Sequence, residues 1–207
     1  VYGFHFLGFS MLTMLWSGSA AWIPSFFART FGWAPAEIGP WFGSAVMVCG
    51  TLGLPLGGLL AERLKKRGLS DANVRVGIIS GVALLPLGVA APLMPTPFAA
   101  LGLYAAFVFF SSLPFGAAAA ALQEITPNQM RAQVSALYLF VVNLTGIGLG
   151  PTIVASITQY GFGADDALKY ALSITAGVAG LLAAVLLALC LPHYRTAVRD
   201  AEAWSRN

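Results

Sequence analysis

Charge is scarce in this sequence: Asp, Glu, Lys and Arg make up 9% of its 207 residues, against about a quarter in an average soluble domain. With a mean hydropathy of +0.79, the chain has too few polar side chains to cover a soluble globule. Its uncharged runs are about 20 residues long, which matches the roughly 30 Å of hydrocarbon that a helix must cross. They lack the two-residue alternation of barrel strands. The composition predicts an all-α membrane protein.

Residues that usually carry chemistry are also few. Cys49 and Cys190 lie inside apolar runs without a CxxC pair, so we expect small packing residues and neither a disulfide nor a metal site. His5 and His193 lie at the ends of apolar runs, where we expect solvated or interfacial side chains and no ligand role. Gly-x-Ser-x-Gly, His-Glu-x-x-His and P-loop motifs are missing, and no carboxylate lies in the middle of an apolar run. We therefore expect no enzyme activity and no cofactor.

Six apolar runs predict six transmembrane helices, with Pro- and Gly-containing turns between several of them. The predicted spans cover residues 4–28, 38–61, 74–93, 98–122, 132–158 and 168–191. The sixth span is expected to stop at Pro192. Residues 1–192 would then form one six-helix bundle, and residues 193–207 a polar cytoplasmic tail.

The cations are unevenly divided between the two sides of the predicted bundle. Nine of the eleven Lys and Arg residues follow spans two and four or lie in the tail, and five of them belong to the segment that Arg63 opens. Short loops rich in Lys and Arg stay in the cytoplasm, so both ends of the chain are predicted to be cytoplasmic. The pI is about 9.1, but the net charge is only +3. Topology explains the cations better than a nucleic-acid partner does.

Polar side chains recur at three- and four-residue spacing in spans one, two, four and five, whereas spans three and six are rich in Ala and Leu. Either these stripes let helices pack closely, or they face a shared cavity, which we favour, with spans three and six facing lipid. Asn143 is the strongest candidate, because an embedded carboxamide needs a partner, on a substrate or on a neighbouring helix. The stripes comprise Ser10, Thr13, Ser17, Ala21 and Pro24; Ser44, Val48, Thr51 and Pro55; Tyr104, Phe107, Ser111 and Phe115; and Tyr138 with Asn143.

A weak internal repeat supports this division. Spans two and five are each the middle helix of a triplet, and each ends in a half rich in Gly and Pro. Because a triplet crosses the membrane an odd number of times, its repeat must be inverted. Inverted three-helix repeats are the building plan of secondary transporters, so the predicted fold is two such repeats.

The stretch GLLAERLKKR at residues 58–67 resembles the GxxxDRxGRR motif of the major facilitator superfamily, with Glu62 in place of Asp and Lys65 in place of Gly. A carboxylate at a helix end interacts favourably with the N-terminus of an adjacent helix, here one from a half that this chain does not contain. Gly58, Glu62 and Arg63 are therefore either a conformational latch, which we favour, or only a marker of the cytoplasmic face.

Two further motifs flank and enter span five. PNQMRA resembles the Pro-x-x-x-Arg-Gly motif of the same superfamily, with Ala for Gly, and it places Arg131 close enough in sequence to pair with Glu124. Gly146, Gly150 and Pro151 resemble a GxxxGP element. Two glycines four residues apart give a flat face for helix contact, and the proline leaves a place that can bend.

These motifs, with HFLG at residues 5–8 and the FGW turn, resemble the second half of bacterial spinster-type major facilitators. The resemblance implies the C-terminal six-helix half of a 12-helix transporter in the bacterial inner membrane, with an N-terminal half as its partner. It also implies alternating access, proton coupling and an amphipathic or lysolipid-like substrate, since spinster-like proteins export lysophospholipids and sphingosine 1-phosphate in animals. The usual proton-coupling carboxylates of the family belong to the other half. The start at Val1, without a signal peptide, also suggests part of a longer protein.

Other functions stay open: a major facilitator for another organic solute or drug, or an oligomeric six-helix channel, although the sequence shows no filter element. A membrane enzyme is disfavoured. The transporter hypothesis predicts substrate contacts at Thr13, Trp16, Ser17, Phe110, Ser111, Tyr138 and Asn143, and latch and hinge roles for Gly58, Glu62, Arg63, Arg131, Gly146, Gly150 and Pro151.

Overall fold

Six helical spans, each long and apolar enough to cross a membrane, make up the described chain, as the sequence predicts. The computed structural model describes the backbone of residues 1–204 and their side chains except those of residues 165, 202 and 204. In chain order the spans are α1 (Tyr2–Phe31); α2 (Pro35–Ala45), η1 (Val46–Gly50) and α3 (Thr51–Lys66); α4 (Ala72–Ala90) and η2 (Ala91–Leu93); α5 (Pro97–Ser112) and α6 (Pro114–Ile125); η3 (Asn128–Met130), α7 (Arg131–Val141), η4 (Val142–Gly148), α8 (Leu149–Ser156) and η5 (Ile157–Phe162); and η6 (Asp165–Ala167) with α9 (Leu168–Trp204).

Local capping explains the turns at one end of the bundle. Gly32 ends α1 in the left-handed region, at a φ of 72°, where a side chain would be strained. The Ala34 backbone N–H then donates to the Glu37 carboxylate (2.8 Å), which caps α2. At the next turn the Thr96 hydroxyl accepts from the Ala99 N–H (3.4 Å). A proline opens both α2 and α5, where its missing N–H costs nothing.

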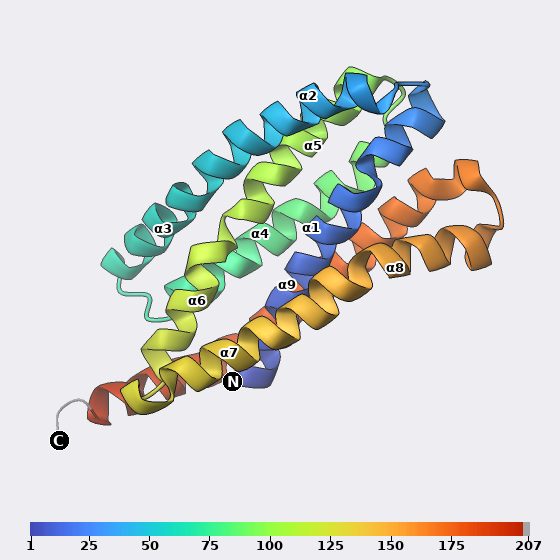
Figure 1. Cartoon of the computed structure of the whole chain (residues 1–207). Coiled ribbons are helices and arrows are strands. Elements are labelled where there is room, and N and C mark those ends of the chain that lie inside the picture. Colours follow the sequence, from blue (N-terminus) through green and yellow to red (C-terminus); the bar gives the residue numbers. More distant parts are fainter. Residues whose placement is uncertain (205–207) are drawn as a thin grey trace.

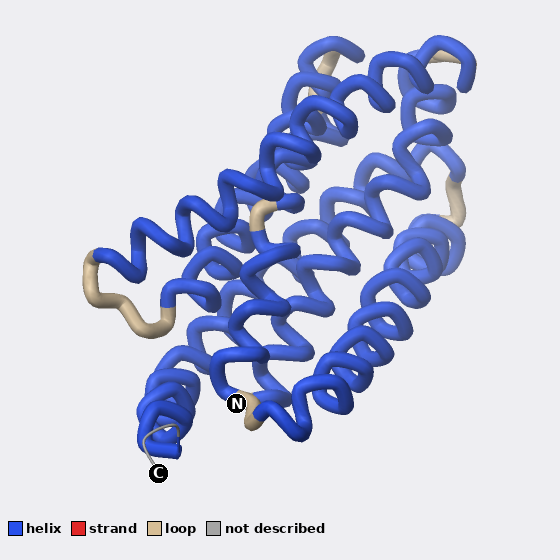
Figure 2. Tube along the Cα trace, turned by 60° about the vertical axis from the view of Figure 1, so that its left-hand side comes forward, coloured by secondary structure: helices blue, strands red, loops and turns tan. Residues whose placement is uncertain are grey.

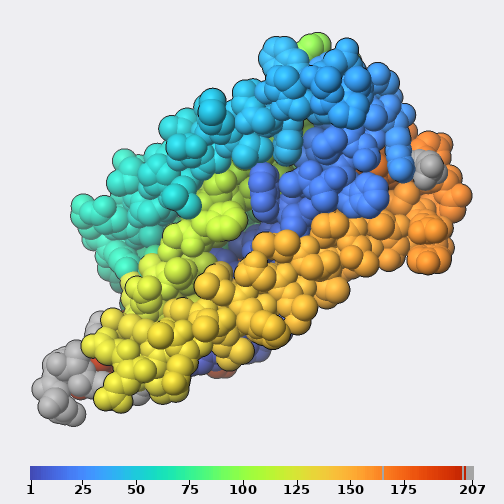
Figure 3. Space-filling model, viewed as in Figure 1, coloured from blue at the N-terminus to red at the C-terminus, as the bar shows by residue number. Residues whose placement is uncertain are grey.

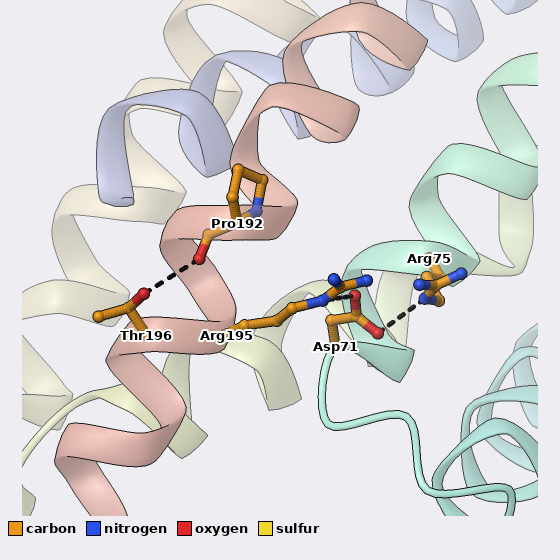
Figure 4. Close-up of polar contacts among 5 residues, drawn as sticks. All are labelled: Asp71, Arg75, Pro192, Arg195 and Thr196. Atoms are coloured by element: carbon orange, nitrogen blue, oxygen red, sulfur yellow. Dashed lines mark hydrogen bonds and ion pairs between the residues drawn. The ribbon is translucent and has the colours of Figure 1, made fainter.

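The sixth span does not stop at Pro192, which lies inside α9. Contacts with neighbouring helices stabilise the continuation: the Tyr194 side chain is fully buried, and its hydroxyl donates to the Ala121 carbonyl (3.0 Å). Arg195 Nε donates to the Asp71 carboxylate (2.7 Å; Figure 4). These contacts stabilise the helix by more than the loss of the backbone hydrogen bond at the proline costs. Residues 205–207 of the predicted tail lie outside the described residues.

Span one is the centre of the bundle, and spans two and five form its edges (Figures 1 and 2). In α1, 61% of the apolar stretch is buried, against 17% in span two and 28% in span five. The helices α4 and α9 pack against each other and against α1. In Figure 3 the near face is hollowed between spans two and five, and α1 lies in its floor. The chain is thus a six-helix wall with one hollowed face.

The two edge spans share one irregularity. In each, eleven residues of α-helix, α2 or α7, lead into a π-helical segment, η1 or η4. A π-helical turn widens the backbone locally and occurs often at functional sites. Its recurrence at the same place in both triplets agrees with the predicted pair of inverted three-helix repeats.

Glycines fix span two to span four. A Cβ at Gly53 would lie 2.6 Å from the Phe109 carbonyl oxygen, and one at Gly57 would lie 2.8 Å from the Leu113 carbonyl carbon. Any side chain at these two positions would meet backbone, which cannot move aside cheaply. Leu113 lies at the break between α5 and α6, so α3 rests on the point where span four is interrupted.

Charged side chains gather at one end of the bundle: at the end of α3 and in the loop at residues 67–71, on both sides of the connector at 126–130, and in the last turns of α9. We call this the basic end. There the buried Asp71 carboxylate accepts from Arg75 Nε and Arg195 Nε, both at 2.7 Å (Figure 4). Burial by itself would raise the pKa of Asp71, but the two guanidinium hydrogen bonds outweigh it and hold that pKa below its usual 3.8. The pair ties α9 to the start of α4.

Candidate functional site

A cavity of about 240 Å³ opens on the hollowed face, between α1, the α5–α6 break and span five. Its wall is mostly apolar and aromatic, with a few hydroxyl and amide groups, as in sites for small organic ligands. The lining residues are Phe9, Leu12, Thr13, Trp16, Ser111, Pro114, Phe115, Ala118, Ala119, Tyr138, Leu139, Val142, Asn143 and Ile147.

Five of the seven predicted substrate contacts lie in this wall, namely Thr13, Trp16, Ser111, Tyr138 and Asn143. The other two lie elsewhere. Ser17 donates to the Gly146 carbonyl of span five (2.8 Å), so its hydroxyl joins two helices. Phe110 packs beside Phe109, with ring centroids 5.3 Å apart, against the small apolar cluster under α3.

Asn143 lies in the π-helical η4 and is exposed on the hollowed face. Its Nδ2 donates to the Leu139 carbonyl of its own helix (2.6 Å), so the bond to a neighbouring helix that the sequence left open is not formed. Among the residues that the structure describes, no other hydrogen bond engages this carboxamide. Its oxygen and second N–H are therefore free for a ligand.

The hydroxyl groups of Thr13 and Ser111 are less free. Thr13 Oγ1 donates to the Phe9 carbonyl (3.0 Å), and Ser111 Oγ donates to the Val108 carbonyl (2.9 Å). Each bond satisfies the hydroxyl proton within its own helix, which leaves only lone pairs for a ligand. Asn143 and Tyr138 thus keep more unused hydrogen-bonding capacity than these two hydroxyl groups.

Three of the predicted polar stripes do not line the cavity as whole faces. In span one only Thr13 of the stripe belongs to the lining residues. In span four, Tyr104 and Phe107 are buried in the aromatic core beside Phe26 and Phe27, and only the later positions reach the cavity. In span two, the predicted stripe is exposed on the edge of the bundle, outside the lining residues: Ser44, Val48, Thr51 and Pro55.

His5 contradicts the expectation of a solvated or interfacial side chain. It is fully buried, and neither ring nitrogen makes a hydrogen bond. Its ring lies against Phe9 and Tyr138, with centroids 4.5 and 5.5 Å away. Both neighbours line the cavity. Hydropathy alone places position 5 near a span end, and only the packing of α6 and α7 over it reveals the burial.

Gly146 and Gly150 bring span five into direct contact with α1. A Cβ at Gly146 would lie 2.8 Å from Thr13 Cβ, and one at Gly150 would lie 3.0 Å from the Met14 carbonyl oxygen. Trp22 Nε1 donates to the carbonyl of Pro151, the next residue (3.0 Å). The predicted flat glycine face is therefore present, and it seats span five on the central helix.

The predicted latch residues lie exposed at the basic end. Glu62 pairs with Lys66 one turn along α3 (2.7 Å), and nothing lies within 4 Å of a Cβ built on Gly58. Arg131 does not pair with Glu124: Arg131 Nε donates to the Thr126 carbonyl (3.1 Å), whereas Glu124 forms an ion pair with a lysine of α3. Lys65 reaches Glu124 because α3 and α6 lie side by side. Arg63 has no ion pair among the described residues.

A larger hollow of about 750 Å³ lies between the loops of the basic end. It is bordered by Lys65, Glu124 and Arg131 and by backbone of the loop at residues 68–70. Most of its charged groups are already paired with one another or with backbone. For this reason we assign the candidate ligand site to the smaller cavity in the membrane-spanning part.

No protein-family model and no curated protein matches the sequence. The structure is similar to two crystal structures of a bacterial homologue of the human lysosomal transporter Spinster, both inward-facing, one unoccupied and one occupied. The TM-scores are 0.62 and 0.65 at 19% sequence identity, over 96% of this chain but only 47% and 49% of those chains. The chain thus spans about half their length, and it has the fold of a six-helix half of these transporter structures.

Proposed function

We propose that this chain is the C-terminal half of a secondary active transporter of the major facilitator superfamily, which works by alternating access. The observation that carries the proposal is the 240 Å³ cavity on the hollowed face of a half-transporter fold. In such transporters the substrate site lies near the bilayer midplane, at the interface between repeats. The cavity here lies in the spanning part of α1, span four and span five, in agreement with that plan.

The partner would be an N-terminal six-helix half that covers the hollowed face. Spans two and five expose large apolar side chains along both edges of the hollowed face. A second half docked on these edges would close the cavity on its open side. The exposed side chains include Trp41, Met47, Leu52 and Leu56 of span two and Leu137, Phe140, Leu144 and Ile147 of span five.

The substrate would be an amphipathic or lipid-like small molecule. Phe9, Trp16, Phe115 and Tyr138 give the cavity a largely apolar surface, and Asn143 adds a carboxamide whose oxygen and second N–H are unused. Such a wall suits an apolar chain or ring with a single polar group. Another organic solute or drug with one polar group on an apolar body would also fit. Transport would be coupled to protons.

The basic end would face the cytoplasm of a bacterial cell, with the chain in the plasma membrane. The loops and helix ends there carry most of the cations, as the positive-inside rule requires. Glu62 would then reach the N-terminus of a helix from the N-terminal half and act with Gly58 and Arg63 as the latch of one conformation. Its exposed position at the end of α3 supports that reach.

Transport by the full-length protein in proteoliposomes tests this function, with fluorescent lysophosphatidylcholine as the probe. Asn143→Ala removes the free amide groups, and the loss of one or two neutral hydrogen bonds of about 0.5–1.5 kcal/mol each should raise the KM for the probe several-fold. Gln133→Ala is the matched control, because it removes an exposed carboxamide from the same span outside the cavity.

The two variants should therefore differ in KM while their thermal unfolding stays alike. Equal KM values for Asn143→Ala and the unmodified protein would remove Asn143 from the site. If the protein takes up a small drug from a test panel but not the lysolipid, the substrate is an organic solute or drug and not a lipid-like molecule.

A further inference from the structure

His5 is a buried polar group that packing alone does not explain. The imidazole has no exposed surface, and neither nitrogen has a hydrogen-bond partner. The backbone of Ala118 on α6 lies beside the ring, but without acceptable hydrogen-bond geometry. An unsatisfied buried polar group costs about 1–3 kcal/mol, whereas a phenyl ring would fill a site among aromatic rings without that cost. An unsatisfied imidazole therefore calls for a role that a phenyl ring cannot fill.

The ring lies directly behind the cavity wall. Phe9, Ala118 and Tyr138 surround it, and all three also line the cavity. One layer of side chains thus separates the imidazole from the ligand space.

A series of polar groups lies between the neighbourhood of His5 and the basic end. One turn along α6 from Ala118, the Ala121 carbonyl accepts from the Tyr194 hydroxyl (3.0 Å). The same hydroxyl lies 2.7 Å from Glu124 Oε2. The Glu124 side chain is 29% exposed, so this series starts at a carboxylate in contact with water and ends one helical turn from the imidazole.

Within this half of the proposed transporter, no carboxylate lies deep in a span. All eight Asp and Glu residues of the sequence lie at or beyond the ends of the six spans. Histidine is the side chain whose charge changes most readily near neutral pH. Around its end of the bundle the other titratable or charged groups include Tyr2 on α1, Tyr138 and Arg131 on α7, Glu124 on α6, Cys190, His193 and Tyr194 on α9, and the Val1 amino group.

We propose that His5 is a proton-binding group of the transport cycle, placed between the substrate cavity and a polar route to the basic end. The inference deepens the proposed function and rests on it. In the closed arrangement the buried imidazole is neutral, because a buried charge without a partner is costly. When the cavity admits water, a ring nitrogen accepts a proton, and the imidazolium returns it to water on the other side after the conformational change. Only a proton is transferred, and no electron moves.

The first experiment measures proton binding without any substrate. In the full-length protein in nanodiscs, labelled with ¹³C at the histidine ring, the His5 signal is the one that disappears in His5→Asn. The signal should stay neutral in the closed arrangement and should titrate between about pH 8 and about pH 5 in the arrangement whose cavity admits water. His193→Asn is the matched control, since it removes an exposed imidazole at the same end. A His5 signal that stays neutral throughout this range in every arrangement that the protein samples overturns the proposal.

The second experiment separates coupling from structure. In proteoliposomes, His5→Asn should lose accumulation of fluorescent lysophosphatidylcholine driven by a pH gradient but keep exchange of the probe without a gradient, and His193→Asn should keep both. Gradient-driven accumulation by His5→Asn equal to that of the unmodified protein overturns the role of His5. If the unmodified protein does not move this lysolipid, the proposed substrate class fails, and the NMR titration alone decides on His5.

Discussion

Two adjacent glycines of α3 give a sharp test of how the edge spans are attached. Gly57 faces the break in span four, where a Cβ would lie 2.8 Å from the Leu113 carbonyl carbon and 2.9 Å from its Cα. Gly58, the next residue, has nothing within 4 Å of the same built atom. Gly57→Ala and Gly58→Ala therefore each add one methyl group to the same helical turn, the first against the backbone of span four and the second in open space.

The expected magnitudes follow from two opposing effects. Replacing glycine by alanine inside a helix stabilises it by about 0.5–1 kcal/mol, because the unfolded chain loses freedom. Gly58→Ala should show this gain alone. At Gly57 the added methyl group meets backbone, and overpacking of this kind costs about 1–3 kcal/mol. Gly57→Ala should then lower the free energy of unfolding by up to about 2 kcal/mol, unless α3 moves away from span four to make room for the methyl group.

Thermal unfolding of the full-length protein in detergent, followed by tryptophan fluorescence, measures the difference. Gly57→Ala should lower the midpoint by several degrees relative to Gly58→Ala, since about 1 kcal/mol corresponds to roughly 2–4 °C in a domain of this size. Equal midpoints for the two variants would show that α3 does not rest on the backbone of span four.

Two charge substitutions at the basic end extend these tests. Asp71→Asn removes the carboxylate that pairs with Arg75 and Arg195, and should speed hydrogen exchange in the last turns of α9. Because the pKa of Asp71 is lowered in the folded protein, its contribution to stability is full above its usual 3.8 and is lost as the pH falls through the lower folded value. The difference in the free energy of unfolding between the unmodified protein and Asp71→Asn should therefore stay constant near neutral pH and become smaller only below about pH 4. A difference that becomes smaller already at higher pH contradicts the pairing. Glu62→Gln should change the transport rate by roughly two- to fivefold, from about 0.3–1 kcal/mol of interaction with a helix N-terminus, whereas the exposed control Asp200→Asn should not; equal rates would remove the latch.

Hydropathy and turn chemistry predict the six spans closely, because burial in a bilayer requires long apolar runs and Gly or Pro ends them. The exception is Pro192, which reads as a stop but lies inside α9. The contacts that carry the helix past it, from Tyr194 and Arg195 to α6 and Asp71, join residues more than 70 positions apart. No local pattern contains such information.

The face of a span is harder to predict than its extent. The stripe in span four assumes one continuous helix from Tyr104 to Phe115, but α5 ends at Ser112 and α6 starts at Pro114. The stripe reaches the cavity only from Ser111, next to this break: Tyr104 is buried in the core, whereas Ser111 and Phe115 line the cavity. In span five, where the glycine pair fixes the contact with α1, Tyr138 and Asn143 reach the cavity as the sequence predicts.

The glycine pairs also indicate which parts of this half move together. Gly53 and Gly57 seat span two on the backbone of span four, and Gly146 and Gly150 seat span five on α1. Contacts at backbone distance leave no room for one helix to slide over the other without a clash. The two edge spans are thus fixed to the helices that form the cavity wall, so the six helices should move as one body. In an alternating-access cycle, the change would then take place where spans two and five meet the other half, and the cavity would open and close at that joint.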